Sequence, residues 1–441
     1  MSSKTSKASG RVVRDVVDGG GLYFSRLATA GPYVFMGSVA VDSSGRIPAE
    51  ARPAVPYHLS PPGHAVTQTQ YIYARYVEGL EALGSSINDV IQVEQYIPAK
   101  IYADGYLDIS RGKGNMERGR PSSALLQTGD LAPDGCVINP TGIAIIPGDG
   151  MVKEIAKSTE GYHSSMTRDE YGEAYEEEGP FNEVVTGGPY VCTVGDIAMN
   201  WGTNDIEEGV KVSPSIWWGS EIRNECEFLL NRLESYVGRV GATLDDVIHT
   251  TVYLTDIGDY FELDRVWKDR FGDNPPARTV VPVLGLGAPR LDAPNLGHAD
   301  LAVKMEHLTK TLRPGAGMTR EVISTGKETL AHEPEAIKAG PILWISQLAA
   351  GGSHSAPDAR SQLEYIFGRL DEICRAGGTE LKNLVRLRAF LADPADAPAV
   401  YAALRDAIPS DPPTVLVTSV PSPLPIPGGS MIIDAIAYVP E

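Results

Sequence analysis

The feature that most constrains this chain is a pair of motifs that occurs three times within 441 residues. Gly31-Pro32-Tyr33-Val34 recurs 157 residues later as Gly188-Pro189-Tyr190-Val191, and Gly340-Pro341-Ile342-Leu343 is a third copy. A second motif follows each copy in the same order, at Leu83–Val90, Val240–Val247 and Gly377–Leu384. Self-similarity at a fixed period is the signature of tandem structural repeats. The sequence therefore predicts three consecutive units of about 147 residues, a third of the chain each.

Each unit shows the same coarse pattern of strands and helices. In the second unit, apolar residues recur at steps of three and four from Ile222 to Val240, which predicts an amphipathic helix. A β-branched run at Val247–Leu254 predicts a strand, and a second helical pattern follows at Tyr260–Phe271. Further strands are expected at 191–199, 278–283 and 299–303. The order β-α-β-α-β-β predicts an α+β fold with both helices on one face of an open sheet.

The ends of the repeats give the expected domain organisation. Polar, charged and Gly-rich stretches separate the units, as is typical of linkers. The expected segments are a disordered tail at 1–10, a first domain at 11–150, a linker at 151–178, a second domain at 179–308, a linker and start of the third domain at 309–335, and a third domain at 336–441.

Charge and composition exclude several classes of function. The chain has 38 Lys and Arg against 57 Asp and Glu, a formal charge of −19, which disfavours nucleic acid as a partner because phosphate is bound chiefly by Lys and Arg. No apolar run is long enough for a membrane helix, and the N-terminus lacks the apolar core of a signal peptide. The four cysteines form no CxxC pair, and no HExxH motif is present, so no structural or catalytic metal is expected. These features predict a cytoplasmic protein.

The second unit contains Gly179-Pro180-Phe181, then Val252–Asp256, then the sequence Asn-Pro-Pro-Ala-Arg-Thr-Val at Asn274–Val280. In these motifs it resembles the Rid family, also called the YjgF family. Family members pair a Gly-Pro-Tyr opening with a late Pro-Ala-Arg-Ser/Thr strand and a closing strand of an acidic residue followed by Ala-Ile-Ala. The third unit closes with Ile433–Ala437, sequence Ile-Asp-Ala-Ile-Ala, and the first with Thr141–Ala144.

The resemblance implies a chorismate-mutase-like α+β fold and a particular assembly. Single-unit members form homotrimers with ligand sites in the clefts between subunits. Three tandem Rid-like βαβαββ units in one chain would therefore form an intramolecular pseudo-trimer with three clefts, which need not be equal. The sequence leaves open which cleft is active and whether pseudo-trimers associate further with one another.

The family's activity, as the resemblance implies it, is hydrolysis of enamine or imine carboxylates to a 2-oxo acid and ammonia, without metal or organic cofactor. Arg278 is the expected clamp for a small carboxylate-bearing substrate, because a guanidinium offers a bidentate fork to a carboxylate. The alternative is that Arg278 forms an ion pair between domains. Ser123 and, by a looser alignment, Thr414 stand at the matching positions, so a single working cleft is expected.

The family's late glutamate corresponds to Asp300 in the second unit, Asp434 in the third and Thr141 in the first. His298 and Asp300 are two residues apart on an expected strand and would share one face. A carboxylate beside an imidazole can shift the pKa of either group toward neutrality. Arg278, Asp300 and His298 are therefore the expected catalytic residues, and a polar contact between domains is the alternative for the last two.

The remaining expected substrate contacts come from other family positions. The family's early tyrosine matches Tyr23, becomes Phe181 in the second unit and maps to His332 in the third. The backbone N–H of Gly195 is expected to bind a carboxylate, and Asp434 completes the set with Arg278. The loss of polar partners favours a longer and less polar substrate, such as the 2-aminomuconate of aromatic catabolism, over aminoacrylate.

Three functions are compatible with these observations. The first is the cofactor-independent deaminase just described. The second is a non-catalytic ligand sensor on the same frame, which the missing arginine in two clefts favours. The third is a ring-opening amidohydrolase, which would need a nucleophile pair such as Ser and Lys that no motif identifies.

Overall fold

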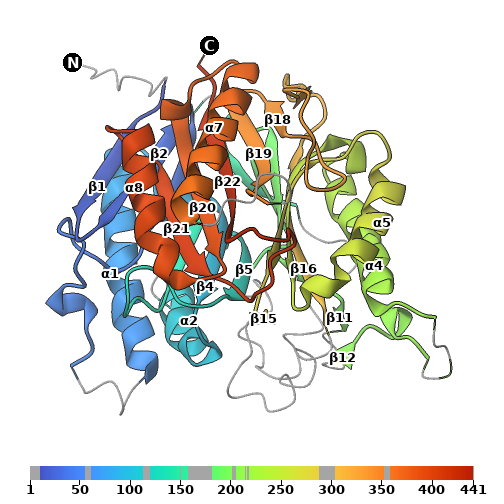
Figure 1. The fold of residues 1–441 in the computed structure, drawn as a ribbon, viewed down its shortest axis with the longest axis horizontal. Helices are drawn as coiled ribbons and strands as arrows, with labels where there is room; N and C mark the ends of the chain where they lie inside the picture. Colours follow the sequence, from blue (N-terminus) through green and yellow to red (C-terminus); the bar gives the residue numbers. More distant parts are fainter. Residues whose placement is uncertain are drawn as a thin grey trace.

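The computed structural model describes residues 10–440 except 55–60, 113–119, 149, 157–180, 201–204, 214, 216–217, 288–302 and 352–357. Three large β-sheets form the interior, and paired helices lie on their outer sides (Figure 1). The expected disordered tail at 1–10 falls, apart from residue 10, outside the described residues, as do the predicted site residues His298 and Asp300.

The first sheet follows the order β1-β2-β3-β6-β4-β5-β15. Helices α1 (Pro61–Ala82) and α2 (Ala103–Gly112) connect its strands. The strands are β1 (Val13–Gly19), β2 (Leu22–Ala30), β3 (Tyr33–Gly37), β4 (Val90–Ile97), β5 (Ser122–Gln127), β6 (Asn139–Ile145) and β15 (Gly285–Leu286).

The second sheet follows the order β14-β13-β16-β9-β8-β7. Its helices are α4 (Glu221–Gly238) and α5 (Tyr260–Phe271). The strands are β7 (Lys153–Ile155), β8 (Val184–Gly187), β9 (Tyr190–Thr193), β13 (Val247–Leu254), β14 (Ala277–Pro282) and β16 (Met305–Leu312). Short strand β10 (Asp196–Ile197) also pairs with β16, and β11 (Met199–Asn200) pairs with β12 (Asp205–Ile206).

The third sheet follows the order β17-β18-β19-β22-β20-β21, with helices α7 (Ala359–Ala376) and α8 (Ala397–Ala407). The strands are β17 (Arg320–Ile323), β18 (Ala336–Ala339), β19 (Ile342–Leu348), β20 (Leu384–Leu391), β21 (Thr414–Ser419) and β22 (Met431–Tyr438). Apart from β15, the three sheets thus have the same strand order. In each, the strands that flank the second helix are parallel neighbours.

Each sheet has three consecutive antiparallel strands before its first helix, and the second sheet also has the short strand β10 there, whereas the sequence predicted one strand. The repeated Gly-Pro motif explains the difference, because it is the turn of a hairpin and not the start of the first strand. Residues Ala30 and Tyr33 pair across Gly31-Pro32, and Gly31, Gly188 and Gly340 have φ of 59°, 60° and 55°. A two-residue hairpin loop with positive φ at its first position favours glycine there. The strands before the turns, β2, β8 and β18, were therefore not predicted from the sequence.

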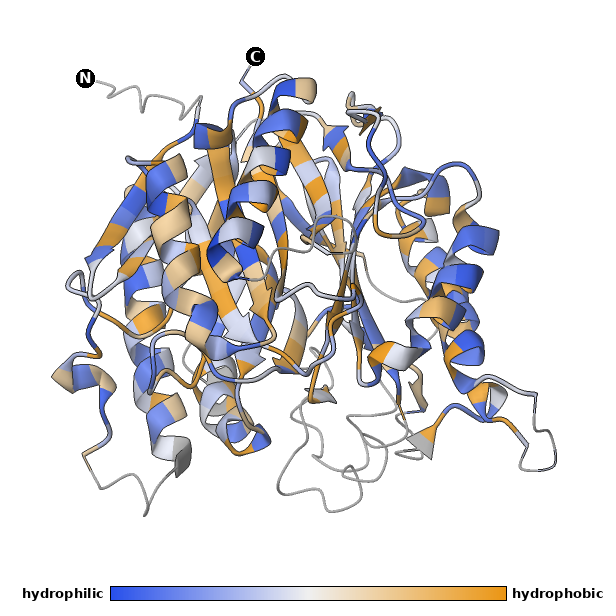
Figure 2. Ribbon diagram, in the orientation of Figure 1, coloured by the Kyte–Doolittle hydropathy of each residue, from blue (hydrophilic) through white to orange (hydrophobic). Residues whose placement is uncertain are grey.

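The apolar residues that the sequence placed on one face of the first helix, from Ile222 to Val237 in the second unit, are buried in α4. The apolar residues of α7 in the third sheet are buried as well, and Figure 2 shows hydrophilic residues on the outer faces of both helices. In the first sheet Tyr73, Tyr76 and Leu80 are buried, but Val77 is 36% exposed and lies outside the core. All four cysteines are free and buried.

Strands also occur where the sequence predicted linkers or domain ends. β7 and β17 lie inside the segments 151–178 and 309–335, and β16 runs through residue 308, the expected end of the second domain. β7 and β17 are short edge strands with exposed side chains, so their composition reads as polar linker. The closing strand expected at 299–303 is β16, which begins at Met305; Val303 is buried but not in a strand.

The three sheets meet in a closed ring, each joined to the other two along a seam. In seam A, between the first and second sheets, Gly195 N donates to Ser123 O. In seam B, between the second and third, Arg278 N donates to Ser346 Oγ. In seam C, between the third and first, Ser25 N donates to Pro413 O. Candidate sites are sought in these seams.

Candidate functional site

Seam B contains the arginine that the sequence singled out. β14 pairs in parallel with β13, which places Arg278 opposite Thr250, and the Arg278 side chain is fully buried. Its Nε donates to Glu333 Oε2 at 2.9 Å, and its Nη2 pairs with Asp264. Its guanidinium carbon lies 5.0 Å from the ring centroid of Trp267. Arg278 is therefore held in an ion pair between sheets, which is the alternative that the sequence left open.

Glu333 is supported by further groups of the seam. Gln347 Nε2 donates to Glu333 Oε1 at 3.0 Å and also to Tyr260 Oη at 3.0 Å. Burial raises the pKa of Glu333 above its ordinary value, although Arg278 acts in the opposite direction. Burial alone would lower the pKa of Arg278, but Glu333, Tyr260 and Asp264 raise it, so the guanidinium stays charged. Seam B thus combines one cation with two carboxyl groups.

The seam B cluster reaches both the interior and the surface. The Glu333 side chain is fully buried, whereas that of Asp264 is 26% exposed. Arg278 Nη1 is buried and has no hydrogen-bond partner among the described residues. The cluster therefore offers an unused donor beside a carboxyl group whose pKa is raised, and such groups are candidates for proton transfer.

Seam A lacks a counterpart to this cluster. β5 pairs with β4 so that Ser123 stands at the register position of Arg278, as expected, and Ser123 Oγ accepts from Gln95 Nε2 at 3.1 Å. The N–H of Gly195, expected to bind a substrate carboxylate, donates instead to Ser123 O at 3.0 Å. A Cβ at Gly195 would lie 2.0 Å from Glu306 Oε1, so glycine is needed there for close packing. The expectation for Gly195 is therefore wrong.

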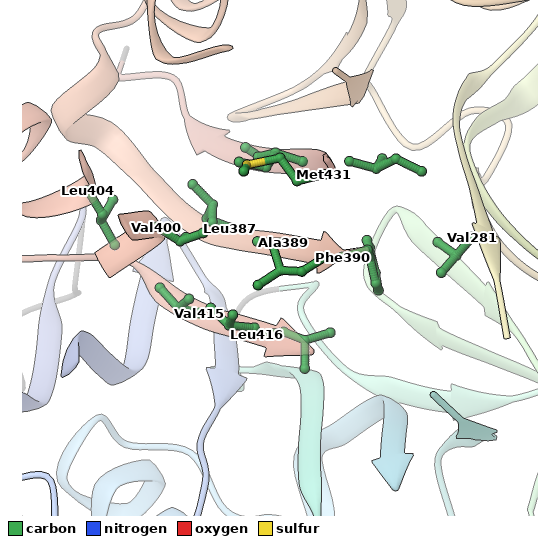
Figure 3. Close-up of a cluster of buried hydrophobic side chains, with 14 of the residues drawn as sticks. Val281, Leu387, Ala389, Phe390, Val400, Leu404, Val415, Leu416 and Met431 are labelled. Atoms are coloured by element: carbon green, nitrogen blue, oxygen red, sulfur yellow. The ribbon is translucent and has the colours of Figure 1, made fainter. Parts of the chain in front are cut away.

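Seam C is apolar where seam B is charged. Thr414 lies opposite Arg386 on β20, just as Ala277 lies opposite His249 on β13, and Arg386 and His249 are register equivalents. Arg278 is one residue beyond Ala277, so its equivalent is Val415, one residue beyond Thr414. The expected match of Arg278 with Thr414 is therefore off by one residue. Val415 is buried in an apolar cluster with residues of β20, β22 and α8 (Figure 3).

A cavity of about 460 Å³ opens beside this cluster in seam C. It is lined by residues of the first and third sheets' regions, among them Leu131, Leu391, Tyr401 and Thr418. Of the described residues that line it, Asp130 and Asp134 are the charged ones. A volume of this size suits a small organic molecule.

Two predicted pocket residues, Tyr23 and His332, lie in seams as structural contacts. Tyr23 Oη donates to Ile408 O at 2.8 Å, next to the end of α8. His332 Nε2 is 2.6 Å from Gly272 O, next to the end of α5, which is the corresponding place in the second sheet. Both side chains tie one sheet to a helix of the neighbouring sheet. Neither lines the Arg278 cluster through its side chain.

Phe181 corresponds to other residues than the sequence alignment suggested. The hairpin pairs Leu27 with Met36, Val184 with Thr193 and Ala336 with Ile345. Counting back three residues from the first member of each pair aligns Phe181 with Phe24 and Glu333. Phe181 itself packs on a small apolar cluster around Val184. In the third sheet, the register position of Phe181 is therefore occupied by the carboxyl group that binds Arg278.

Asp434 is buried on β22 and ion-paired within its own sheet. Its Oδ1 accepts from Arg388 Nε at 2.9 Å, and its Oδ2 accepts from Thr279 Oγ1 at 2.6 Å. The register places Leu308, and not Asp300, at the matching position of β16. Asp434 is thus a bridge between the second and third sheets rather than a group open to a ligand.

Sequence reasoning missed Glu333, Asp264, Tyr260 and Gln347. The available signal was the strand register, which equates Glu333 with Phe181 but depends on recognising the hairpin. Among the described residues, no cluster of His, Cys, Asp and Glu could hold a metal ion. Within that same part of the chain, no helix is long and apolar enough to cross a membrane.

Comparison with known proteins finds one family whose model matches a segment of the chain. The model of the family described as "Endoribonuclease L-PSP" matches residues 172–292. A "RutC family protein" of Pyrococcus abyssi is 27% identical over 108 residues, which are 24% of this chain and 76% of the relative. A "2-iminobutanoate/2-iminopropanoate deaminase" of Dermatophagoides farinae is 28% identical over 108 residues, 24% of this chain and 76% of the relative.

A solved structure of a chorismatase matches over a longer stretch. It is 12% identical, covers 80% of this chain and 93% of its own, and has a TM-score of 0.47. The match to the family model and the Gly-Pro-Phe and Pro-Ala-Arg-Thr motifs fall in the same segment, residues 172–292. This segment of the chain is thus similar to the Rid (YjgF) family.

Proposed function

We propose that the chain is an intramolecular pseudo-trimer of three Rid-like units. The support is that three sheets share one strand order and close a ring through three seams. The units would run from β1 to β6, from β7 to β16 and from β17 to β22, which moves the expected boundaries outward to include the edge strands.

We further propose that the chain hydrolyses the C=N bond of an imine, or of an enamine through its imine form, in seam B. The observation that carries this proposal is the cluster in which Arg278 lies between Glu333 and Asp264. A relative that matches part of the chain is named as an imine deaminase, which favours the same reaction class.

The charge of the cluster bears on the substrate. One guanidinium and two ionised carboxylates sum to −1, and protonation of Glu333, whose pKa is raised, brings the sum to 0, so the arginine's charge is compensated in either state. Like charges about 4 Å apart repel by about 4 kcal/mol at an effective dielectric constant of about 20. A substrate carboxylate would therefore be repelled from Arg278, whereas a neutral imine or a protonated iminium would be accepted. We propose that the substrate carries no carboxylate at the reacting carbon.

The residues can supply the proton transfers that hydrolysis needs. Water adds to the carbon of the C=N bond, one proton of that water moves to a carboxylate, and the nitrogen receives a proton. The carbinolamine then loses ammonia and becomes a carbonyl compound. Glu333, whose pKa is raised, would act as the acid and base, while Gln347 positions its other oxygen. Arg278 would hold both carboxyl groups in place.

The test measures ammonia release by the full chain from freshly generated imines, in excess of the spontaneous rate. One substrate is the imine of a neutral ketone, and the others are 2-iminopropanoate and aminoacrylate. We expect turnover of the neutral imine and a loss of about 100-fold or more in kcat for Glu333→Gln, the usual contribution of a general acid or base. Glu364→Gln, in an exposed pair with Arg360, is the control.

Each result has a defined meaning. A preference for the carboxylate substrates would refute the charge argument but retain the deaminase. Unchanged kcat in Glu333→Gln, with turnover present in the parent chain, would remove seam B as the site. Absence of turnover with every imine would reject the deaminase.

A second candidate function is binding without chemistry, and the cavity in seam C favours it. The cavity has a volume of about 460 Å³. In the same seam, Val415 stands at the register position that Arg278 has in seam B. Its charged lining within the described residues consists of Asp130 and Asp134. This function predicts saturable binding of a neutral or cationic small molecule that weakens on Tyr401→Ala, with no ammonia released from any imine.

A further inference from the structure

Side chains of β4, β13 and β20, one strand from each sheet, contact one another at the centre of the ring, which is called the axis below. β4, β13 and β20 each begin with a register shift against their antiparallel neighbour. After the shift, equivalent residues pair with the first residue of the neighbouring parallel strand. Alternate residues of a strand share one face, so the equivalent positions form three successive levels. The levels are Gln92, His249 and Arg386; Glu94, Thr251 and Arg388; and Tyr96, Tyr253 and Phe390.

Charged groups from all three sheets meet at these levels. Glu94 Oε1 accepts from Lys310 Nζ at 3.2 Å and from Arg386 Nη1 at 3.4 Å. Glu94 Oε2 accepts from Arg388 Nη1 at 2.6 Å. Arg388 also pairs with Asp434. All five side chains are at most 2% exposed.

The charges of this axial cluster do not cancel. Lys310, Arg386 and Arg388 contribute three positive charges, and Glu94 and Asp434 contribute two negative charges, so the described groups sum to +1. Burial lowers the pKa of Lys310 to about 8, which leaves it protonated at pH 7. An uncompensated buried charge costs several kcal/mol. The cluster therefore lacks one negative charge.

The two arginines differ in how their donors are used. Arg388 donates to Asp434, Glu94, Thr251 and Tyr96. Arg386 is 2% exposed, and its Nε and Nη2 have no hydrogen-bond partner among the described residues. The unused donors belong to a guanidinium that lies close to Lys310, because Arg386 Nη1 and Lys310 Nζ donate to the same oxygen of Glu94.

We propose that the axis binds one small monovalent anion of the halide class between Arg386 and Lys310. The unused N–H groups of Arg386 and the Lys310 ammonium would donate to it, and its single charge would balance the cluster. The imidazole of His249, which stands at the same level and whose pKa is lowered by burial and then by Lys310, stays neutral and adds no competing charge. This site is independent of the chemistry proposed for seam B.

The first test is thermal unfolding of the full chain in sodium bromide or chloride against sodium gluconate at equal ionic strength. An anion bound by the folded state alone raises the unfolding temperature with its concentration. We expect such a rise in halide, no comparable rise in gluconate, and no difference between the salts for Arg386→Gln. Arg360→Gln, which changes an exposed arginine, should retain the parent's response.

The second test locates the anion by anomalous scattering from crystals grown in bromide. A peak beside Arg386 is expected in the parent chain. Should Arg386→Gln fail to fold, Gln92→Glu provides the alternative, because it adds a carboxylate at the level of Arg386 and should abolish both the peak and the halide response. Equal unfolding temperatures in the two salts together with no bromide peak on the axis would overturn the proposal. A peak elsewhere with the axis empty would do the same.

Discussion

Replacing Glu94 by glutamine tests the energetics of the ring's centre most directly. One Glu94 carboxylate accepts hydrogen bonds from three cations, of which two, Lys310 and Arg386, bind the same oxygen. At about 3 Å and an effective dielectric constant of about 20, each pair is worth about 5 kcal/mol before desolvation is counted. The variant would change the charge of the described cluster from +1 to +2.

We expect Glu94→Gln to lower the free energy of unfolding by about 3–5 kcal/mol, the usual cost of breaking a buried ion pair. Urea unfolding followed by tryptophan fluorescence measures this loss, since Trp344 is buried near the axis and in ring contact with His249. Adding Lys310→Met to Glu94→Gln returns the net charge to +1 and should recover part of the loss. Glu364→Gln is the exposed control, with an expected effect below about 1 kcal/mol.

The same variant has a distinct acid response. Burial would raise the pKa of Glu94, but Lys310, Arg388 and Arg386 lower it well below its ordinary value. A depressed folded pKa gives stability that is present above the unfolded value, about 4.3, and is lost as the pH falls. Glu94→Gln should therefore flatten the acid limb of the stability curve. A loss of less than 1 kcal/mol at pH 7 with an unchanged acid limb would refute this account of the axis.

Three further predictions concern other sites. Burial raises the pKa of Glu225 to about 7, so the free energy of unfolding of the parent should fall by up to about 3 kcal/mol between pH 4.5 and 7. Urea titrations of Glu225→Gln should lack this dependence on pH. Burial lowers the pKa of Lys310 to about 8, so the free energy of unfolding should rise between pH 8 and 10.5 in the parent but not in Lys310→Met. Parallel curves of unfolding free energy against pH for the two proteins would contradict this. Gly195→Ala would place Cβ 2.6 Å from Ala124 Cβ and closer still to Glu306. We expect this overpacking to lower the free energy of unfolding by about 1–3 kcal/mol. Gly209→Ala is the control, because Gly209 has open space around it and the same change should cost much less there.

Local signals in the sequence predicted much of the fold. The helix stripes are read from a 3.6-residue period that needs no tertiary partner, and the stripe of α4 from Ile222 to Val237 is buried as expected. The glycines Gly84, Gly241 and Gly378 end or follow the first helices with φ of 78°, 77° and 82°, a conformation that glycine adopts readily. These features repeat because the same backbone geometry recurs.

The closing strand of the second sheet shows where local signals fail. β16 contains Glu306, His307 and Lys310, whose polar side chains are typical of surface positions. In the structure each of them is at most 2% exposed. Their partners come from elsewhere: Lys310 binds Glu94 of the first sheet, 216 residues away. A charged residue can be buried when it is paired, and the pairing is not local. The strand was therefore expected several residues too early.

The sequence by itself identified the repeated motifs, the resemblance of one segment to the Rid family and Arg278 as a candidate site residue, because these are properties of motif order and residue type. Only the tertiary structure decided what Arg278 binds, since Glu333 lies 55 residues further along the chain in another sheet. The net charge of a site is the sum over groups brought together by folding, and no one repeat contains it. The ring of three sheets thus brings two carboxyl groups to one guanidinium in seam B, and three cations to two carboxylates on the axis.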